Sequence, residues 1–305
     1  MIDVLELGAT LYMPATRTDL AAALSGGHIP GLRSAVVCLE DAVRAEHVPA
    51  ALASLAALLA RPGLDGGAPL VFVRPRDPTM LARILRMPGV ERVAGFVLPK
   101  VTAETLPEWL AHPFAPSHLL MPTLETREMF DPVEARRLRD QLLVVQERVL
   151  AVRIGGNDLL QCLGVRRAPG RTSYDGPLGP LIAMLAGVFL PFGIPLSAPV
   201  MEGYGEPVLL RDEFQRDMEH GLFTKTVIHP AQIAVVQGAL TVPARDLAEA
   251  EAILGCAAPA VFAANRRMCE PATHRRWAET IVRRAALFGA AEPIGLAASG
   301  SRQFG

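Results

Sequence analysis

Eight short runs of apolar residues alternate along the chain with longer segments of helical character. The runs are rich in β-branched residues and lie at residues 9–13, 34–39, 70–74, 94–98, 118–124, 149–154, 194–200 and 222–228. Several of them, such as residues 35–39 and 70–73, are apolar throughout, which is typical of strands that are buried on both faces by helices. The pattern therefore predicts a parallel sheet.

The segments between the runs carry helix signals. Residues 46–60 are dense in Ala and Leu, and residues 206–220 end at Gly221, a common helix stop. Asp77 and Asp131 each precede a proline, so each is an N-cap acid before a proline at the first helical position. Strand and helix alternate eight times over about 240 residues, the typical size of a (β/α)8 barrel. The alternative, a doubly wound open sheet, needs a Gly-rich turn after its first strand, and residues 13–16 do not provide one.

We therefore predict a TIM barrel over residues 1–240, followed by a C-terminal helical extension. Residues 244–264 and 271–289 predict two further helices that a closed barrel does not need. We expect residues 241–290 to form a lid or to pack against a neighbouring subunit. Residues 291–305, rich in Gly and Ser, are expected to form a flexible tail.

Charge and composition exclude several classes of protein. The 30 Lys and Arg residues and 31 Asp and Glu residues leave a net charge of −1, which argues against a nucleic-acid or polybasic membrane binder. The four cysteines show no C-x-x-C spacing. The N-terminus lacks a signal-peptide pattern, and no run reaches the ~18 apolar residues of a membrane span. We expect a cytoplasmic protein with reduced thiols and with neither nucleic acid nor membrane as partner.

Charged side chains stand where most of the apolar runs end, and the carboxyl ends of the strands form the catalytic face of a TIM barrel. The residues at these ends are Arg17, Glu40, Asp41, Arg74, Lys100, Glu125, Asp158, Lys225 and His229. Any one of them could be a solvated loop charge. Their recurrence at strand after strand indicates a shared site that combines carboxylates with cations.

Glu125 and Asp158 are the candidate metal ligands. They follow neighbouring strands, so their carboxylates can converge, and two carboxylates completed by waters and substrate oxygens suit Mg²⁺. The alternative is a loop cap or a salt bridge. Gly155 and Gly156, just before Asp158, permit a close backbone approach to a ligand, or serve a tight turn.

Arg74 and Arg17 are the candidate binding groups for a substrate carboxylate, because a planar guanidinium matches that group. The alternative is that they pair with acids of the chain, such as Glu40 and Asp41. A loop at residues 166–175 carries three more arginines, which could bind a phosphate or a coenzyme A group or could simply be solvated.

Six motifs resemble those of the HpcH/HpaI aldolase and citrate lyase β-subunit family. They occur in the family's order and lie at strand ends: LEDAV (39–43), VRP (73–75), VLPKV (97–101), LET (124–126), GGNDL (155–159) and KTVIHPAQ (225–232). The segment MCEP (268–271) is similar to the family's C-terminal lid motif. The resemblance implies a Mg²⁺-dependent barrel enzyme that makes or breaks a carbon–carbon bond beside a carbonyl.

The resemblance also implies roles for individual residues. Glu125 and Asp158 would hold Mg²⁺ or Mn²⁺, and Arg74 would hold the carboxylate of a small keto or hydroxy acid, free or as a coenzyme A thioester. Glu40, Asp41 and Lys100 form a second rank of catalytic candidates, and Arg17, Gly155 and Gly156 join Arg74 in substrate binding. In relatives the proton is moved by a lid aspartate of the adjacent subunit. Here that position is Glu270, which implies a homo-oligomer, such as a trimer or hexamer.

The sequence also departs from the family. The segment at residues 197–202 replaces the family's aspartate-bearing seventh strand, and Glu270 is one methylene longer than aspartate. These departures indicate a divergent branch. Three other functions remain open: condensation followed by thioester hydrolysis, as in malate synthase-like relatives; a Schiff-base aldolase with Lys100 or Lys225 as nucleophile; and a catalytically silent barrel that serves as an assembly partner.

Lys100 and Lys225 are the chain's two lysines among its 30 basic residues. Both fall at or beside predicted strand ends, where a compact ammonium fits and a guanidinium does not. We expect both to support Glu40, Asp41 or Glu125 electrostatically rather than to act as nucleophiles.

Overall fold

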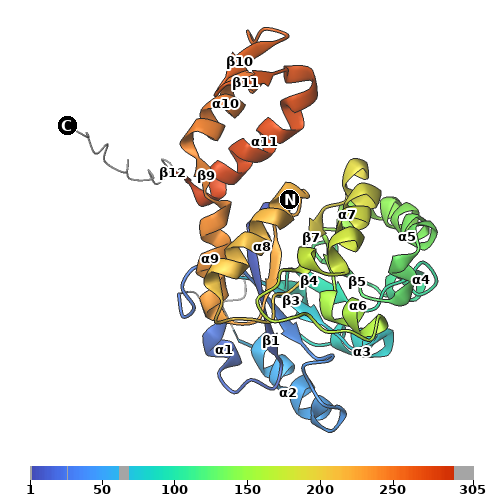
Figure 1. Cartoon of the computed structure of the whole chain (residues 1–305). Coiled ribbons are helices and arrows are strands. Elements are labelled where there is room, and N and C mark those ends of the chain that lie inside the picture. The colour runs from blue at the N-terminus through green and yellow to red at the C-terminus, as the bar shows by residue number, and fades with distance from the viewer. Residues whose placement is uncertain (1, 26, 62–68, 292–305) are drawn as a thin grey trace. The chain divides into compact units, whose positions relative to one another are not determined.

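The computed structural model describes residues 2–25, 27–61 and 69–291 of the chain. The chain divides into two compact units, Met1–Gln237 and Gly238–Gly305, which are described separately below (Figure 1). The sequence placed this boundary at residue 240.

Eight parallel strands form the centre of the first unit. They are β1 (Ala9–Pro14), β2 (Ser34–Cys38), β3 (Leu70–Arg74), β4 (Gly95–Leu98), β5 (Leu119–Leu124), β6 (Val152–Ile154), β7 (Leu196–Ser197) and β8 (Lys225–Val227). Their spatial order is β7-β6-β5-β4-β3-β2-β1-β8. Ala198, just after β7, bridges to β8: its N–H donates to Thr224 O at 2.7 Å, and its carbonyl accepts from Thr226 N at 3.2 Å. This bridge closes the ring, so the predicted barrel is confirmed and the open-sheet alternative is wrong.

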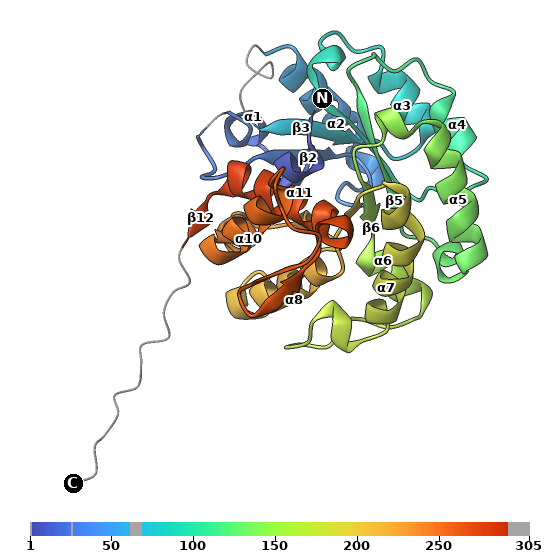
Figure 2. The same ribbon diagram turned by 90° about the horizontal axis from the view of Figure 1, so that it is seen from above.

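Helices surround the strands of the first unit (Figure 2). They are α1 (Leu20–Ala23), α2 (Val48–Leu59), α3 (Pro78–Ile84), α4 (Leu106–Leu110), α5 (Pro132–Val144), α6 (Gly156–Cys162), α7 (Leu178–Phe189), α8 (Pro207–Glu219) and α9 (Pro230–Leu240). The two predicted N-caps are confirmed. The Asp77 carboxylate accepts from Met80 N at 2.7 Å, and the Asp131 carboxylate accepts from Val133 N at 2.8 Å. Each satisfies a backbone N–H that the first turn leaves without a partner.

The second unit is partly helical. It contains α10 (Ala244–Leu254), a hairpin of β10 (Phe262–Ala264) and β11 (Arg267–Cys269), and α11 (Pro271–Phe288). The prediction of one helix over 244–264 is wrong beyond Leu254. Asn265 and Arg266 both have positive φ, 49° and 60°, which gives the twist of a two-residue hairpin turn rather than a helix. The short strands β9 (Val242–Pro243) and β12 (Ala290–Ala291) pair in parallel, and the rest of the predicted tail lies outside the described residues.

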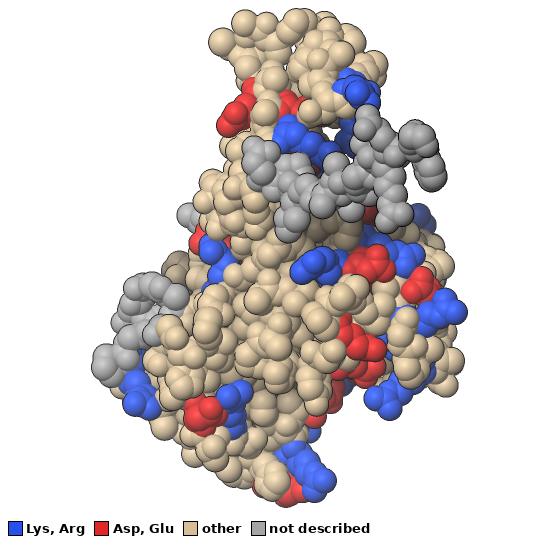
Figure 3. All heavy atoms as spheres, turned by 60° about the vertical axis from the view of Figure 1, so that its left-hand side comes forward, with Lys and Arg blue, Asp and Glu red and all other residues tan. Residues whose placement is uncertain are grey.

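Two findings concern the helices and the surface of the molecule. Within the described ranges, no helix combines the length and apolar character needed to cross a membrane. On the face seen in Figure 3, Lys and Arg side chains are interspersed with Asp and Glu side chains.

Candidate active site

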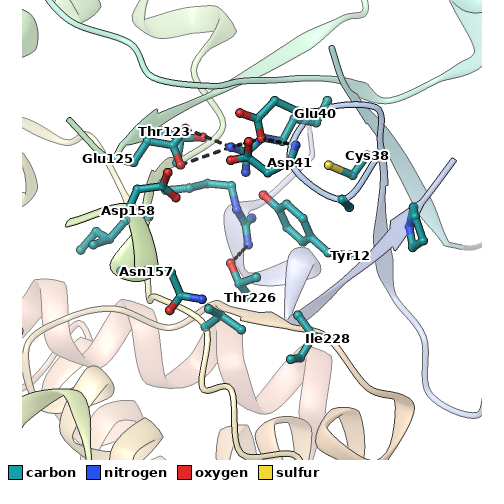
Figure 4. A pocket seen from close by; sticks show the side chains of 18 of the residues that line it. Tyr12, Cys38, Glu40, Asp41, Thr123, Glu125, Asn157, Asp158, Thr226 and Ile228 are labelled. Atoms are coloured by element: carbon teal, nitrogen blue, oxygen red, sulfur yellow. Dashed lines mark hydrogen bonds and ion pairs between the residues drawn. The ribbon is translucent and has the colours of Figure 1, made fainter. Parts of the chain in front are cut away.

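A cavity of about 470 Å³ lies at the carboxyl ends of the barrel strands (Figure 4), within the usual range for small-molecule sites. The residues that line it come from strands β1, β2, β3, β5, β6 and β8 with the segments after them, and from the segment after β7: Tyr12, Met13, Pro14, Cys38, Glu40, Asp41, Ala42, Arg74, Thr123, Glu125, Arg153, Ile154, Gly155, Gly156, Asn157, Asp158, Val200, Thr226 and Ile228. Most of the predicted site residues are therefore brought together at one place.

Glu125 is buried, with 3% of its surface exposed, directly after β5. Its carboxylate accepts from Arg74 Nη2 at 3.0 Å and from Lys100 N at 2.7 Å. Burial raises the pKa of Glu125 to about 7, although the Arg74 charge opposes this, and the neighbouring Asp158 charge adds to the rise. Lys100 has a positive φ of 52°, a strained conformation for a side chain with a Cβ, and this turn aims its N–H at Glu125.

Arg74 joins two carboxylates across three strands. Its Nη2 lies 3.0 Å from Glu125 and 2.9 Å from Glu40, and the side chain is almost fully buried. Burial opposes its charge, but the Glu125 carboxylate, with smaller effects of Tyr12 and Glu40, raises the pKa of Arg74. The pairing that the sequence analysis left as the alternative for Arg74 is thus present.

Lys100 lies close to three carboxylates at the open end of the cavity. Its Nζ lies 2.6 Å from Glu40 Oε1, 3.2 Å from Asp41 Oδ2 and 3.9 Å from Asp158 Oδ1. Partial burial opposes the charge, but the hydrogen bond to Glu40 and the two carboxylates raise the pKa of Lys100 well above its usual value. Burial opposes the charge of Asp41 as well, yet its hydrogen bonds with Glu40 and Lys100 lower its pKa.

Asp158 lies in the first turn of α6, after the two glycines. Its side chain is one-quarter exposed, and burial raises its pKa. Figure 4 shows its carboxylate directed toward that of Glu125. A Cβ on Gly155 would lie 2.4 Å from Glu125 Cβ, and one on Gly156 would lie 2.9 Å from Pro199 Cβ. Both positions therefore require glycine, because the backbone passes too close to these neighbours for a side chain.

The chemistry of this set of donors fits Mg²⁺. Glu125 and Asp158 offer hard carboxylate oxygens at one wall of a cavity with room for the waters and substrate oxygens that Mg²⁺ keeps. In the described part of the chain, no group of three or more His, Cys, Asp or Glu side chains has the arrangement of a metal site. A site of two protein ligands completed from solution is what these residues could provide.

Four of the residues predicted for the catalytic face do not line the cavity: Lys100, which contacts acids that do, and Arg17, Lys225 and His229. Arg17 does not line it and pairs with Asp19. Lys225 is fully buried beside α8, where its Nζ lies 2.9 Å from Glu213 and 2.7 Å from Asp217. The expectation that Lys225 supports the acids of the site is therefore wrong, because the first residue of β8 points away from the barrel interior.

Glu270 belongs to the second unit, at the N-terminus of α11. Its backbone N–H donates to His274 Nδ1 at 3.1 Å, and its carboxylate accepts from Thr273 Oγ1 at 3.1 Å. Its catalytic role stays a prediction. In the arginine-rich loop, Arg167 donates to Ser173 Oγ and Val200 O and pairs with Glu213, so this arginine holds the loop to the barrel.

Sequence reasoning missed Arg153, Tyr12 and Thr226, which form the inner part of the cavity. Arg153 Nη2 donates to Thr226 Oγ1 at 2.6 Å, drawn as a dashed line in Figure 4, and its guanidinium lies 5.3 Å from the centre of the Tyr12 ring. A signal was present: Arg153 is a charged residue inside an otherwise apolar predicted strand.

Solved structures share this fold. The protein CitE of Mycobacterium tuberculosis, in complex with magnesium, acetoacetate and coenzyme A, is 24% identical over 92% of this chain and 98% of its own, with a TM-score of 0.66. A citrate lyase of Burkholderia xenovorans is 20% identical over 94% of each chain, with a TM-score of 0.70. Malate synthase of Haloferax volcanii is 15% identical over 77% of this chain and 75% of its own, with a TM-score of 0.63. At these identities the likeness establishes the fold alone.

The family comparison goes further. No curated protein is a significant match to the sequence. The model of the family described as C–C bond lyase of the TIM-barrel fold, in contrast, matches residues 1–290. This match covers both units and agrees with the barrel and the six motifs at its strand ends. The chain therefore belongs to the family of carbon–carbon bond lyases of the TIM-barrel fold and is a carbon–carbon lyase.

Proposed function

We propose that this lyase is a Mg²⁺-dependent enzyme that cleaves or forms a carbon–carbon bond in a small hydroxy or keto acid, free or as its coenzyme A thioester. The observation that carries the proposal is the pair of carboxylates, Glu125 and Asp158, that meet beside a buried cation at the end of neighbouring strands. The fold shared with CitE of M. tuberculosis, which binds magnesium, acetoacetate and coenzyme A, supports it.

The protein's own residues hold the Glu125 carboxylate in place for a cation. Mg²⁺, or Mn²⁺ in its place, would be held by Glu125 and Asp158 and would supply the positive charge that stabilises an enolate. Arg74 and the Lys100 N–H fix the Glu125 carboxylate, so its orientation is set before a ligand arrives. Gly155 leaves the space that this carboxylate occupies.

Lys100 and Asp41 are placed to contact substrate at the open end of the cavity. Both side chains are about half exposed or more, and they lie 3.2 Å apart, so they can reach substrate as a charged pair. Lys100 is also held by Glu40 at 2.6 Å, which keeps its ammonium in place.

The same contacts disfavour a Schiff-base mechanism. A nucleophilic lysine must be neutral, whereas paired carboxylates raise the pKa of both lysines even though burial opposes their charge. Lys225 in addition is fully buried. Reduction with borohydride in the presence of substrate should therefore trap no adduct, and EDTA should abolish turnover.

Two conservative substitutions test the metal site. Glu125→Gln and Asp158→Asn should each abolish Mg²⁺-dependent turnover of keto and hydroxy acids while the barrel keeps its circular dichroism spectrum. Glu134→Gln, the same change of charge on the partly exposed carboxylate of α5 that pairs with Arg137, is the control and should behave as wild type. Full turnover in either site variant would refute the assignment.

We also propose a homo-oligomer, a trimer or hexamer, in which Glu270 serves the site of an adjacent subunit. Glu270→Ala and Asp158→Asn would each be inactive alone, and mixed oligomers of the two would regain activity because some sites would hold both native residues. Mixtures that stay inactive would refute a shared site. Product analysis with a labelled thioester separates lyase activity from condensation followed by hydrolysis.

A further inference from the structure

The interior of the barrel is apolar on one side and polar on the other. Strands β2 to β5 contribute a buried apolar cluster that includes Val36, Phe72, Val97 and Met121. Strands β1, β6 and β7, and the segment leading into β8, contribute buried polar side chains instead, which are Thr10, Arg153, Ser197 and Thr224. Ser34 of β2 and Thr123 of β5 adjoin this polar side. Barrel interiors are usually filled by branched apolar residues, so the buried polar side chains on this side require an explanation.

Arg153 is the centre of this polar side. It is 1% exposed and crosses the interior from β6 to reach Thr226 on β8 and Thr10 on β1. These partners are neutral hydroxyls, and its other contacts, the Met121 sulfur and the Tyr12 ring, are neutral too. Its Nε is buried without a partner. Among the described residues, no carboxylate lies within ion-pair distance of its guanidinium.

This isolation distinguishes Arg153 from the other buried cations of the barrel. Lys225, equally buried, has two carboxylates, and Arg74 also has two. Burying a charge without a counter-charge is strongly unfavourable, and an arginine cannot lose its proton to escape the penalty. An anion at this place would supply the missing charge.

The surroundings of Arg153 can serve an anion as well. Its register neighbours on β5 and β7 are Thr123 and Ser197, whose hydroxyls are buried without a partner, as is that of Thr224. Native proteins leave few such groups unpaired. Arg153, Thr123 and Thr226 also line the cavity that holds Glu125 and Asp158, so a small ligand can reach both ends.

We propose that Arg153, with Thr226 and the neighbouring hydroxyls, binds a carboxylate of the substrate deep in the barrel. This deepens the proposed function, on which it rests: the substrate carries a carboxylate in addition to the oxygens that would face the cation held by Glu125 and Asp158. Arg74, whose Nη2 is occupied by two acids of the chain, then serves chiefly to position Glu125.

Binding is measured in EDTA, which removes divalent cations, so that the anion site is tested apart from the metal site. Thermal unfolding and calorimetry would measure binding of malonate, with malonamide as the neutral analogue of the same size. Wild type should bind malonate and not malonamide. Arg153→Met should bind malonate roughly 10- to 100-fold more weakly, the effect of losing a charged hydrogen-bond donor.

Two further readouts guard against a purely structural role. Replacing an unpaired buried charge by an apolar side chain of similar length should leave the melting temperature of the ligand-free protein unchanged or raised. Thr226→Val, which keeps Arg153, should weaken malonate binding less. The proposal would be overturned by wild type that ignores malonate, or by Arg153→Met that melts lower and binds malonate like wild type. Failure of the proposed function would appear separately, as absent Mg²⁺-dependent turnover.

Discussion

Gly155→Ala is the most direct test of how the backbone shapes the site. The added Cβ would lie 2.4 Å from Glu125 Cβ and 2.6 Å from Oε2, whereas carbon atoms in contact lie about 3.5–4.0 Å apart. Glu125 would have to retreat by about 1 Å or more, away from Arg74 and the Lys100 N–H. Overpacking of this kind costs about 1–3 kcal/mol, which lowers the melting temperature of a unit this size by roughly 2–12 °C.

The functional effect should be similar in size to the effect on stability. Loss of the groups that orient a ligand typically lowers metal affinity about 10- to 100-fold, and we expect that range for Mg²⁺ binding by calorimetry. Gly187→Ala is the matched control: Gly187 is exposed in α7 with open space around it, so this change should stabilise by about 0.5–1 kcal/mol. A Gly155→Ala variant with unchanged Mg²⁺ affinity and melting temperature would refute the reasoning.

Two more predictions concern buried charge and pH. Lys225→Met should destabilise by ~3–5 kcal/mol, measured by urea unfolding, because it leaves the buried Asp217 carboxylate without a cation, and adding Asp217→Asn should restore part of the loss. His118 is buried and neutral, with one ring nitrogen donating to Val90 O, and burial lowers its pKa. The unfolded chain therefore binds the proton more readily, so stability should fall as pH drops from about 6.5 through the folded pKa. Unfolding of His118→Gln should lack this part of the pH dependence.

Much of the site could be predicted because strand ends are visible in the sequence. A charged residue directly after an apolar run must leave the barrel core, and in a parallel barrel all such ends meet on one face. This logic places Glu40, Arg74 and Glu125 in one cavity, as observed. It identifies position along a strand, however, and not the direction of a side chain.

The errors follow from that limit. Side chains alternate between the two sides of a strand, so Thr224 and Thr226 face the interior while Lys225 faces α8. Which parity points inward depends on where pairing begins, and the apolar run around β8 does not fix it. Arg153 was overlooked for the same reason: an arginine within a run looks like a flaw in the pattern until its inward direction is known.

The charges of the cavity make the binding of the acid and the binding of the metal depend on each other. The charged side chains at its walls and open end are Glu40, Asp41, Glu125 and Asp158 against Arg74, Lys100 and Arg153. When all are ionised the acids exceed the cations by one, so an anion entering first meets a slightly negative site, which a divalent cation makes positive. Metal and acid should therefore bind cooperatively, each raising the affinity of the other by the same factor. Arg153 lies at the inner end of the cavity. If the metal binds first at Glu125 and Asp158, the acid must therefore pass the bound metal to reach Arg153.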